Sequence, residues 1–475
     1  MKYKILSIVL IILLIFISIF FTSYYNNDAS YVYHQHLEDS SDESMCIENT
    51  YCSHLPIINI NTNNKEIPTK NTDVTSETVD YIIGDIEISD NGNDVNYLGK
   101  DSDKLKARIR YRGRSSLNFD KKSYLIKFVD ENNKKINKKF LGMPSDSEWV
   151  LNGPFIDKTL IRNYMWYNIS QEIMGLAPKT RFIELYLDNE YQGVYLAVEA
   201  VTQSEKSRIK MEDFNKDSNA TSYIIQLDDE IGTPFNSINS LSMNTYKVLS
   251  PLNLIIKYPN EEDLNVEVKK YIYDDFAKFE KMLYSFDYKE YKNYIDVDSF
   301  VNYFIINEFT QNYDAGYLST YIYKDVSGKY KMYIWDFNSA NNNYERDLLI
   351  EGTQCFEFDK SLWFEMLLKD PNFVETIIKR YKELRKTFLS DDYLNNYINE
   401  IVAYLGPAID RNFDKWGYTF KETYEQFQTN YMPVNHDDAI NHLKKSISIR
   451  AKWLDENIDT LKQYSHESKN KKFNK

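Results

Sequence analysis

The chain has 475 residues, of which 57 are Lys or Arg and 71 are Asp or Glu, so its net charge is −14. This balance argues against a nucleic-acid binder whose affinity rests on phosphate contacts over a broad surface. Hydrophobic residues make up 43% of the chain, enough to bury a large core in one two-lobed domain or in two domains. Three cysteines give no zinc spacing, although Cys46 and Cys52 are close enough in sequence to form a disulfide in an oxidising compartment.

The first 24 residues predict a membrane-targeting segment. Lys2 and Lys4 precede an almost uninterrupted apolar run from Ile5 to Phe21. A run of about 17 residues is just long enough to span a bilayer, and no small-residue cleavage motif follows it. We expect an uncleaved anchor that places the rest of the chain outside that membrane, and a cleaved export signal is the alternative. Residues 25–78 are polar and lack a sustained period, which predicts a disordered tether.

Regular periodicity begins near residue 79, and a cluster of basic residues follows. Residues 104–139 hold 13 Lys or Arg against Asp120, Asp130 and Glu131, although the chain is acidic as a whole. Within KLKARIRYRGRSS, strand alternation separates a basic face from an apolar one. The residues on the basic face are Lys106, Arg108, Arg110 and Arg112.

The basic strand leads into Arg112-Gly113-Arg114-Ser115-Ser116. The glycine permits a tight turn, and the serines offer hydroxyl and backbone donors to an anion. Residues 122–128 read as a second strand, on which Lys127 shares its face with Leu125 and Val129. A lysine on an apolar face often binds a phosphate or a carboxylate. The alternative is that these lysines keep a strand edge soluble.

The next elements predict a mixed α/β lobe, followed by a mainly helical one. A helix is expected from Asp157 to about Met174, with Glu172 beside its buried stripe, either paired with Lys127 or simply at the surface. Strands are expected over 181–187, 192–200 and parts of 220–260, and helical periodicity dominates after residue 261. We predict an α+β chain with an N-lobe over 79–205, a C-lobe over 206–464 and a polar tail over 465–475.

A hairpin within the helical lobe brings two carboxylates together. Residues 317–324 and 329–335 are β-rich runs joined by Asp325-Val326-Ser327-Gly328, a turn sequence. A turn centred between Val326 and Ser327 places Asp314 and Asp336 at the open end, within roughly 10 Å of each other. With Asn338 nearby, these acids could hold a hard cation and accept a proton from a hydroxyl. Solvated turn carboxylates are the alternative.

Together these segments resemble the CotH family, the spore coat protein H kinases. The resemblance covers most of residues 80–460 in order, and no single motif decides it. The matching segments are RGRSS (112–116), KKSYLIKF (121–128), LGMPSDSEWVLNGP (141–154), DKTLIRN (157–163), APKTRFIELYLDNEYQGVYL (177–196), SFVNYFIINEFTQNYDAGYLSTYIYKD (299–325), MYIWDFNSA (332–340) and RNFDKW (411–416).

The resemblance implies a bilobal atypical protein kinase that binds ATP and Mg²⁺ between its lobes and phosphorylates serines of spore coat proteins and of itself. It implies that Asp314 is the catalytic-loop aspartate and that Asp336, with Asn338 and Asp314, binds the metal. Lys127, with Lys122 as substitute, would grip phosphate, and Glu172 would be the partner of that lysine. The remaining nucleotide contacts would be the basic loop, Arg112, Arg114, Ser115 and Ser116, and the strand end at Val198, Glu199 and Ala200.

Two departures from the family pattern bear on this assignment. Asn338 stands where many members have Asp, which loses a charge at the metal, and Ala200 follows Glu199 where many have Lys. A second hypothesis is a non-catalytic coat or cell-surface scaffold that retains the fold. A third is an exported enzyme acting on a polyanionic wall polymer. The resemblance favours the spore coat or a membrane that surrounds the forespore as the location.

Overall fold

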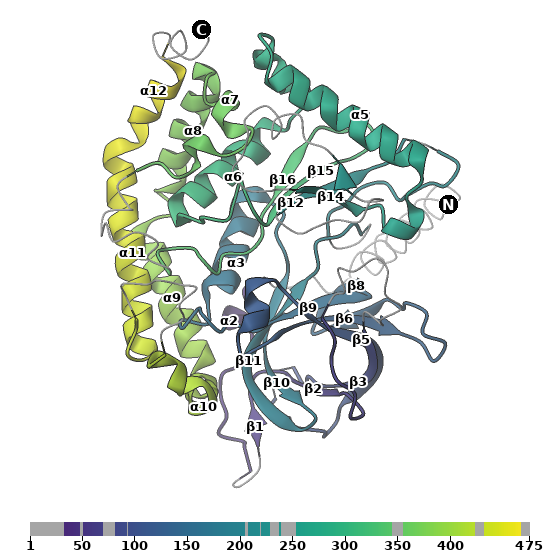
Figure 1. Ribbon diagram of the computed structural model, residues 1–475. Coiled ribbons are helices and arrows are strands. Elements are labelled where there is room, and N and C mark those ends of the chain that lie inside the picture. Colours follow the sequence, from purple (N-terminus) through teal and green to yellow (C-terminus); the bar gives the residue numbers. More distant parts are fainter. Residues whose placement is uncertain are drawn as a thin grey trace, which may run out of the picture.

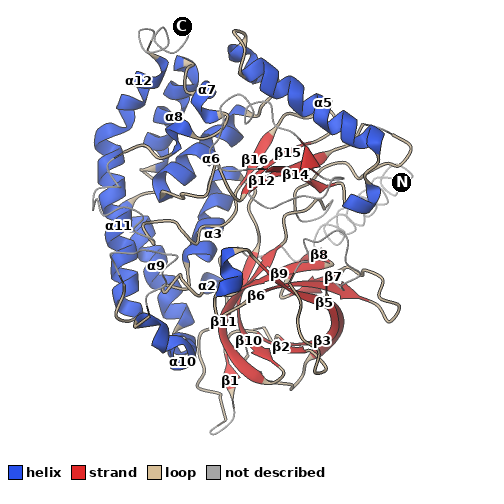
Figure 2. Ribbon diagram, viewed as in Figure 1, coloured by secondary structure: helices blue, strands red, loops and turns tan. Residues whose placement is uncertain are grey.

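A closed β-barrel forms the first large unit of the computed structural model (Figures 1 and 2). The structure describes residues 33–47, 51–69, 81–92, 94–204, 208–218, 220–228, 237–238, 253–343, 355–422 and 432–466. Neighbouring barrel strands are antiparallel, except that β2 and β10 pair in parallel and so close the barrel. In spatial order the strands are β10 (Thr180–Leu187), β11 (Glu190–Glu199), β9 (Glu148–Asn152), β6 (Ser123–Val129), β5 (Asp103–Arg112), β3 (Ile82–Ser89) and β2 (Ile57–Asn61).

Side-chain alternation decides which residues fill the barrel. Ala107 and Ile109 of β5 are fully buried in the interior cluster, so the basic residues between them face outward, as predicted. The outward cations contact neighbours on the wall: Lys106 pairs with Glu131, and Arg108 Nε donates to Asn133 Oδ1 at 2.8 Å. On β6, Ile126 points inside, while Leu125 packs against the second, larger hydrophobic core.

The segment predicted to be a tether contains part of the barrel. Residues 33–47 and 51–69 are ordered, and β2 lies between β3 and β10 with Ile58 and Ile60 fully buried. The prediction of disorder was therefore wrong here, because the partners of β2 lie at residues 82–89 and 180–187 and give no local signal. The predicted anchor, residues 1–24, lies outside the described residues, as does the predicted tail beyond residue 466.

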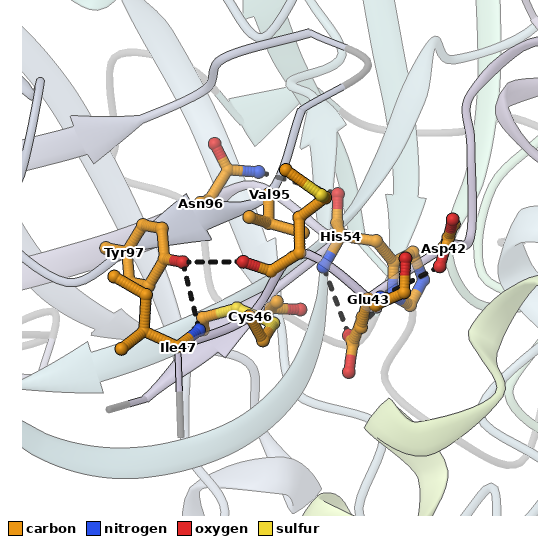
Figure 3. The surroundings of a disulfide bond; sticks show 12 residues. Asp42, Glu43, Cys46, Ile47, His54, Val95, Asn96 and Tyr97 are labelled. Carbon is orange, nitrogen blue, oxygen red and sulfur yellow. Dashed lines mark hydrogen bonds and ion pairs between the residues drawn. A yellow bond between two sulfur atoms is a disulfide. The ribbon is translucent and has the colours of Figure 1, made fainter. Parts of the chain in front are cut away.

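A disulfide joins Cys46 to Cys52 in this N-terminal segment (Figure 3). Near it, the imidazole of His54 contacts Glu43 at 2.7 Å. Arg411 of α10 (Pro407–Trp416) pairs with Glu43 at 2.8 Å and with Glu184 of β10 at 3.0 Å. The segment thus ties the barrel to the helical part of the chain. The small strands in this region are β1 (Cys52–Ser53), paired with β4 (Asn96–Tyr97), and a short helix, α2 (Gln35–Glu38), precedes them.

A second sheet carries the predicted hairpin. Its strands, in spatial order, are β13 (Ser237–Ile238), β14 (Asn253–Tyr258), β12 (Tyr223–Asp228), β15 (Thr320–Lys324) and β16 (Lys331–Tyr333). The hairpin of β15 and β16 is confirmed, and Gly328 N donates to Asp325 O at 2.9 Å across its turn. Its register differs from the prediction by one residue, because Ile322 pairs with Met332. A further small sheet consists of β7 (Lys138–Phe140) and β8 (Met143–Asp146).

Helices make up most of the remaining described chain, so the fold is α+β, as predicted (Figure 2). Several begin at side-chain caps: Asp296, Asp370 and Ser390 each accept a bond from a backbone N–H of the first turn. The other helices are α3 (Arg162–Met174), α5 (Val266–Leu283), α6 (Val297–Thr310), α7 (Phe364–Leu367), α8 (Pro371–Leu384), α9 (Asp391–Leu405), α11 (His436–Asn457) and α12 (Lys462–Ser465).

Helix α3 runs between the barrel and the helical part, and it packs against β10 and α6 (Figure 1). It begins at Arg162 rather than at Asp157, because Leu160 has a left-handed φ of 66° that interrupts the turn before it. Gly175 ends it with a φ of 74°, as the sequence predicted. Most of its residues are buried, including polar ones such as Arg162 and Asn163.

Candidate functional site

The loop that follows β16 holds Asp336 in an unusual backbone conformation. Asp336 has a φ of 56°, in the left-handed region that non-glycine residues seldom occupy, although Asp tolerates it better than most. Residues held in this region cluster at functional sites, where the surrounding structure stabilises them. The residue as a whole is only partly buried.

Side chains from α3 hold this loop in place. Each turn of the first half of the helix supplies a donor or an acceptor to residues 336–341, so the loop depends on the helix for its shape. The contacts are Arg162 Nε to Ala340 O (2.9 Å), Phe337 N to Asn163 Oδ1 (2.7 Å), Trp166 Nε1 to Asn341 Oδ1 (2.7 Å) and Asp336 N to Tyr167 Oη (3.1 Å).

A buried ion pair fixes the start of α3. Arg162 pairs with Asp157, and their side chains are each only 2% exposed. Asp157 also accepts bonds from Thr159 N at 3.1 Å and from Arg162 N at 3.0 Å. Asp157 thereby satisfies backbone N–H groups at the start of the helix from five residues upstream. Because a buried pair is costly to break, this arrangement holds Arg162 against the Asp336 loop.

The loops of the two predicted aspartates are joined to each other. Asn312 Nδ2 donates to Asp336 O at 3.0 Å, and Ser339 Oγ donates to Asn312 Oδ1 at 3.1 Å. Asp314 lies two residues after Asn312, in a turn in which its carbonyl accepts from Leu318 N at 2.6 Å. The structure therefore brings together the loops of Asp314 and Asp336 at the open end of the hairpin, where the sequence placed them.

Asp228, which sequence reasoning did not single out, also lies at this end. It is the last residue of β12, and its Oδ2 accepts from Ser319 N at 3.3 Å and from Gln226 Nε2 at 2.6 Å. Burial raises the pKa of Asp336, and the carboxylate of Asp228 adds to that rise. The available signal was an acidic residue directly after the apolar run YIIQL, but its closeness to Asp336 depends on the pairing of β12 with β15.

Arg112 supplies a positive charge on the barrel side of Asp336. Its guanidinium lies over the ring of Trp335, 5.4 Å from the centroid, and it opposes the rise in the pKa of Asp336. The loop after it turns at Gly113, whose φ is 107°, where a Cβ would collide with Ser116 Oγ. Ser115 and Ser116 open a 3₁₀ turn, and Arg114 and Ser115 are exposed. Lys122 Nζ donates to Leu117 O at 2.7 Å within the same loop.

The partner of Lys127 is Glu148 and not Glu172. Lys127 Nζ lies 2.7 Å from Glu148 Oε2 on the adjacent strand β9, and the two side chains are 28% and 27% exposed. Burial raises the pKa of Glu148, but Lys127, Arg208 and Lys257 together hold it below its usual value. Glu172 instead lies 3.1 Å from His34, so the predicted Lys127–Glu172 pair was wrong. The alternation in EWVLN was the signal that could have placed Glu148 on the outer face with Lys127.

A comparison with family models decides the relationship of this chain to known proteins. The model described as CotH kinase protein matches residues 109–454, well over half of the chain. The chain belongs to the CotH family. The matched range begins in β5 and ends in α11, and so includes the basic loop, Lys127, α3 and the loops of Asp314 and Asp336.

The chain is also similar in sequence to a curated spore coat protein. Inner spore coat protein H of Bacillus subtilis (strain 168) is 28% identical over 239 residues. The aligned region covers 50% of this chain and 59% of that protein, so it spans little more than half the length of the relative. Among the described helices of the present CotH chain, none is both long and apolar enough to cross a membrane.

The strand end predicted to lie beside adenine is buried in this CotH chain. Val198, Glu199 and Ala200 are at most 7% exposed, and Glu199 N donates to Lys179 O at 3.0 Å. The Glu199 carboxylate lies 3.7 Å from the Lys179 ammonium. Burial lowers the pKa of Lys179, and Glu199 opposes that effect. These contacts account for Glu199 as a buried ion-pair partner, and the role of the strand end in nucleotide binding stays a prediction.

The residues around Asp336 suit a magnesium ion that is shared with a bound phosphate. In the described part of the chain, no three His, Cys, Asp or Glu side chains are grouped closely enough to hold a metal ion by themselves. Mg²⁺ typically uses one or two carboxylates, with waters and substrate phosphates completing its shell. Burial and Asp228 both disfavour the charged form of Asp336, and a divalent cation would compensate for both effects. The donor set therefore fits Mg²⁺ in that shared mode.

Proposed function

We propose that this CotH protein is a protein kinase that transfers the γ-phosphate of ATP to serine hydroxyls of spore coat proteins and of itself. The observation that carries the proposal is the Asp336 loop, where a partly buried aspartate in a left-handed conformation is held by α3 and tied to the Asp314 loop. The name of the family model and the name of the Bacillus subtilis relative support the same activity and setting.

Each part of the site has a proposed role in phosphoryl transfer. The barrel would act as the N-lobe of a bilobal kinase-like fold, and the helical part would act as the C-lobe. Bound ATP would supply the phosphoryl group, and Mg²⁺ would neutralise part of the charge on its phosphates. The chain would position the reacting groups and stabilise the charge that develops during transfer. The carboxylate of Asp336 would hold the metal, and Asp314 would orient the serine hydroxyl and accept its proton.

The cations of the barrel wall would hold the phosphates. Arg112 lies over the ring of Trp335, the residue before Asp336, and Lys127, positioned by Glu148, would neutralise the α- and β-phosphates. Ser115 and Ser116 would offer donors from the turn after Gly113. Under this proposal the protein would act at the spore coat or at a membrane around the forespore, with residues 1–24 as its anchor or export signal.

Phosphate incorporation tests the proposal directly. The full chain would be incubated with γ-labelled ATP and Mg²⁺, with its own serines and dephosphorylated casein as acceptors. Wild type is expected to incorporate label, and Asp314→Asn is expected to lose incorporation by about 10²-fold or more while still binding nucleotide, because only the proton acceptor is removed. Asp274→Asn, in a surface pair on α5, is the matched control and should behave as wild type. Equal incorporation by the Asp314 variant would contradict the assigned role.

The second hypothesis, a non-catalytic scaffold, predicts a different result in a thermal-shift measurement. Its melting temperature would not rise when ATP and Mg²⁺ are added, because only a ligand that binds the native state stabilises it.

A further inference from the structure

The side-chain amide of Asn338 has an orientation that the backbone determines. Phe337 N lies 2.7 Å from Asn163 Oδ1, and a backbone N–H can only donate, so the atom of Asn163 that faces it is an oxygen. The other end of that amide, Nδ2, lies 3.0 Å from the Asn338 side chain and must donate to it. The Asn338 atom at this contact is therefore its carbonyl oxygen, Oδ1.

This orientation turns the amide nitrogen of Asn338 toward Asp336. Asn338 Nδ2 donates to Asp336 Oδ1 at 2.7 Å, and Asn338 N donates to the same oxygen at 3.3 Å. Both donors converge on Oδ1 of Asp336. The other carboxylate oxygen of Asp336, Oδ2, accepts no hydrogen bond from a described residue. Asn163 is only 7% exposed, so water cannot readily replace its contact with Asn338.

We propose that Asn338 is a hydrogen-bond donor that positions the Asp336 carboxylate, and not a metal ligand, and that Asn163 is the positioning residue that fixes this arrangement. The identity of the cation rests on the proposed function. The orientation of the Asn338 amide rests only on its hydrogen bonds with Asn163 and Asp336. The proposal replaces the metal role that the family resemblance implied for Asn338. The Asn338 nitrogen carries two hydrogens and offers no lone pair to Mg²⁺, and its carbonyl oxygen is directed at Asn163, from which it accepts a bond. Oδ2 of Asp336 is then the oxygen that is held ready for the ion.

Binding of Mn²⁺ to the full chain, followed by the EPR signal of the free ion, separates the two roles. If Asn338 and Asn163 act through one hydrogen bond, then N338A and N163A should each weaken Mn²⁺ binding by about tenfold, as loss of an outer-shell contact typically does. The N163A/N338A double variant should lose less Mn²⁺ affinity than the product of the two single effects, because both variants remove the same bond between Asn163 and Asn338. D336N should weaken binding more than any of them, because it changes the ligand itself.

N343A is the matched control, since Asn343 Nδ2 donates at 2.7 Å to the backbone carbonyl of Asn338 and leaves its side chain untouched. We expect N343A to bind Mn²⁺ as wild type does. A loss in N338A that approaches that of D336N while N163A has little effect would identify Asn338 as a ligand and overturn the proposal. The proposal would also be overturned if the loss of Mn²⁺ affinity in the double variant equalled the product of the two single losses, because the residues would then act independently.

A second readout needs no metal. The melting temperature of the metal-free protein should fall more for N163A than for N338A, because N163A also leaves Phe337 N without its acceptor. The fall in the double variant should be smaller than the sum of the two single falls, because both variants remove the same bond between Asn163 and Asn338. Additive falls would contradict the network. If wild type binds no Mn²⁺ while the melting temperatures are non-additive, the metal role in the proposed function fails and the positioning of Asp336 by Asn338 stands.

Discussion

The barrel and the Asp336 loop are stabilised in different ways. The barrel depends on backbone ladders between strands that are distant in sequence and on an apolar interior, and its outer cations contact neighbours on the same wall. The Asp336 loop has no described ladder beyond β16, and its hydrogen bonds come from single side chains of α3, including the charged Arg162, and from Asn312.

Because of this difference, we expect the barrel wall to tolerate single substitutions better than the Asp336 loop does. The wall can lose one exposed ion pair at a cost of about 0–1 kcal/mol, because each charge there also contacts solvent. The loop depends on single atoms of single residues, so one substitution in α3 changes it. At Asp336, Arg112 favours the charged carboxylate, whereas burial and Asp228 disfavour it, so a bound cation would stabilise that charge.

Removal of β2 should have the largest effect. A chain that begins at residue 79 lacks Ile57–Asn61, which leaves β3 and β10 without a partner on one side. We expect it to lose cooperative thermal unfolding by circular dichroism, because the barrel cannot close. A chain that begins at residue 33 retains β2 and is the control, expected to unfold with the midpoint of the full chain. Matching midpoints for both truncations would show that the barrel does not need β2.

Loss of the buried pair at the start of α3 should come next. Arg162→Met leaves Asp157 buried without its partner, and we expect the free energy of unfolding in urea to fall by about 3–5 kcal/mol. The Asp157→Asn/Arg162→Met double variant removes the stranded charge and should recover part of that loss. Lys106→Met, in an exposed pair on the wall, is the comparison and should change stability by less than about 1 kcal/mol. A similar loss in Lys106→Met would erase the distinction between the two regions.

The choice between Glu148 and Glu172 should give a smaller effect. Glu148→Gln removes the charge that positions Lys127, and we expect the Kd for Mg·ATP to rise about tenfold, or roughly 1.4 kcal/mol. Glu172→Gln alters a carboxylate that is 37% exposed and pairs with His34, so the Kd should not change. Isothermal titration calorimetry measures both constants. The reverse result, with Glu172 important and Glu148 neutral, would restore the original pairing.

The sequence predicted the local parts of this fold well. The alternation of β5, the Asp325–Gly328 turn and the helical periods each depend on neighbouring residues, and the structure confirms all three. The hairpin register was off by one residue, because turn residues alone do not fix how a short ladder continues beyond them. The late start of α3 follows from the left-handed Leu160, which no composition rule would predict.

The remaining errors concern contacts between distant segments. Ile57 of β2 pairs with Glu184 of β10, far along the chain, and Glu148 lies on a strand that fits between β6 and β11. Asp228 reaches Asp336 only through the order of the second sheet. The orientation of Asn338 depends on Asn163, at a separation of 175 residues. Residue types indicated the chemistry of the site, while long-range pairing decided which of them meet.

The most direct test of the account is the Mg²⁺-dependent binding of ATP by wild type and Asp336→Asn. The melting temperature of each would be measured with ATP in the presence and absence of Mg²⁺. We expect Mg²⁺ to raise the melting temperature of ATP-bound wild type and to leave that of the Asp336 variant unchanged, because the variant lacks the carboxylate that would hold the ion. An equal Mg²⁺-dependent rise in both proteins would contradict the central claim that Asp336 binds the metal.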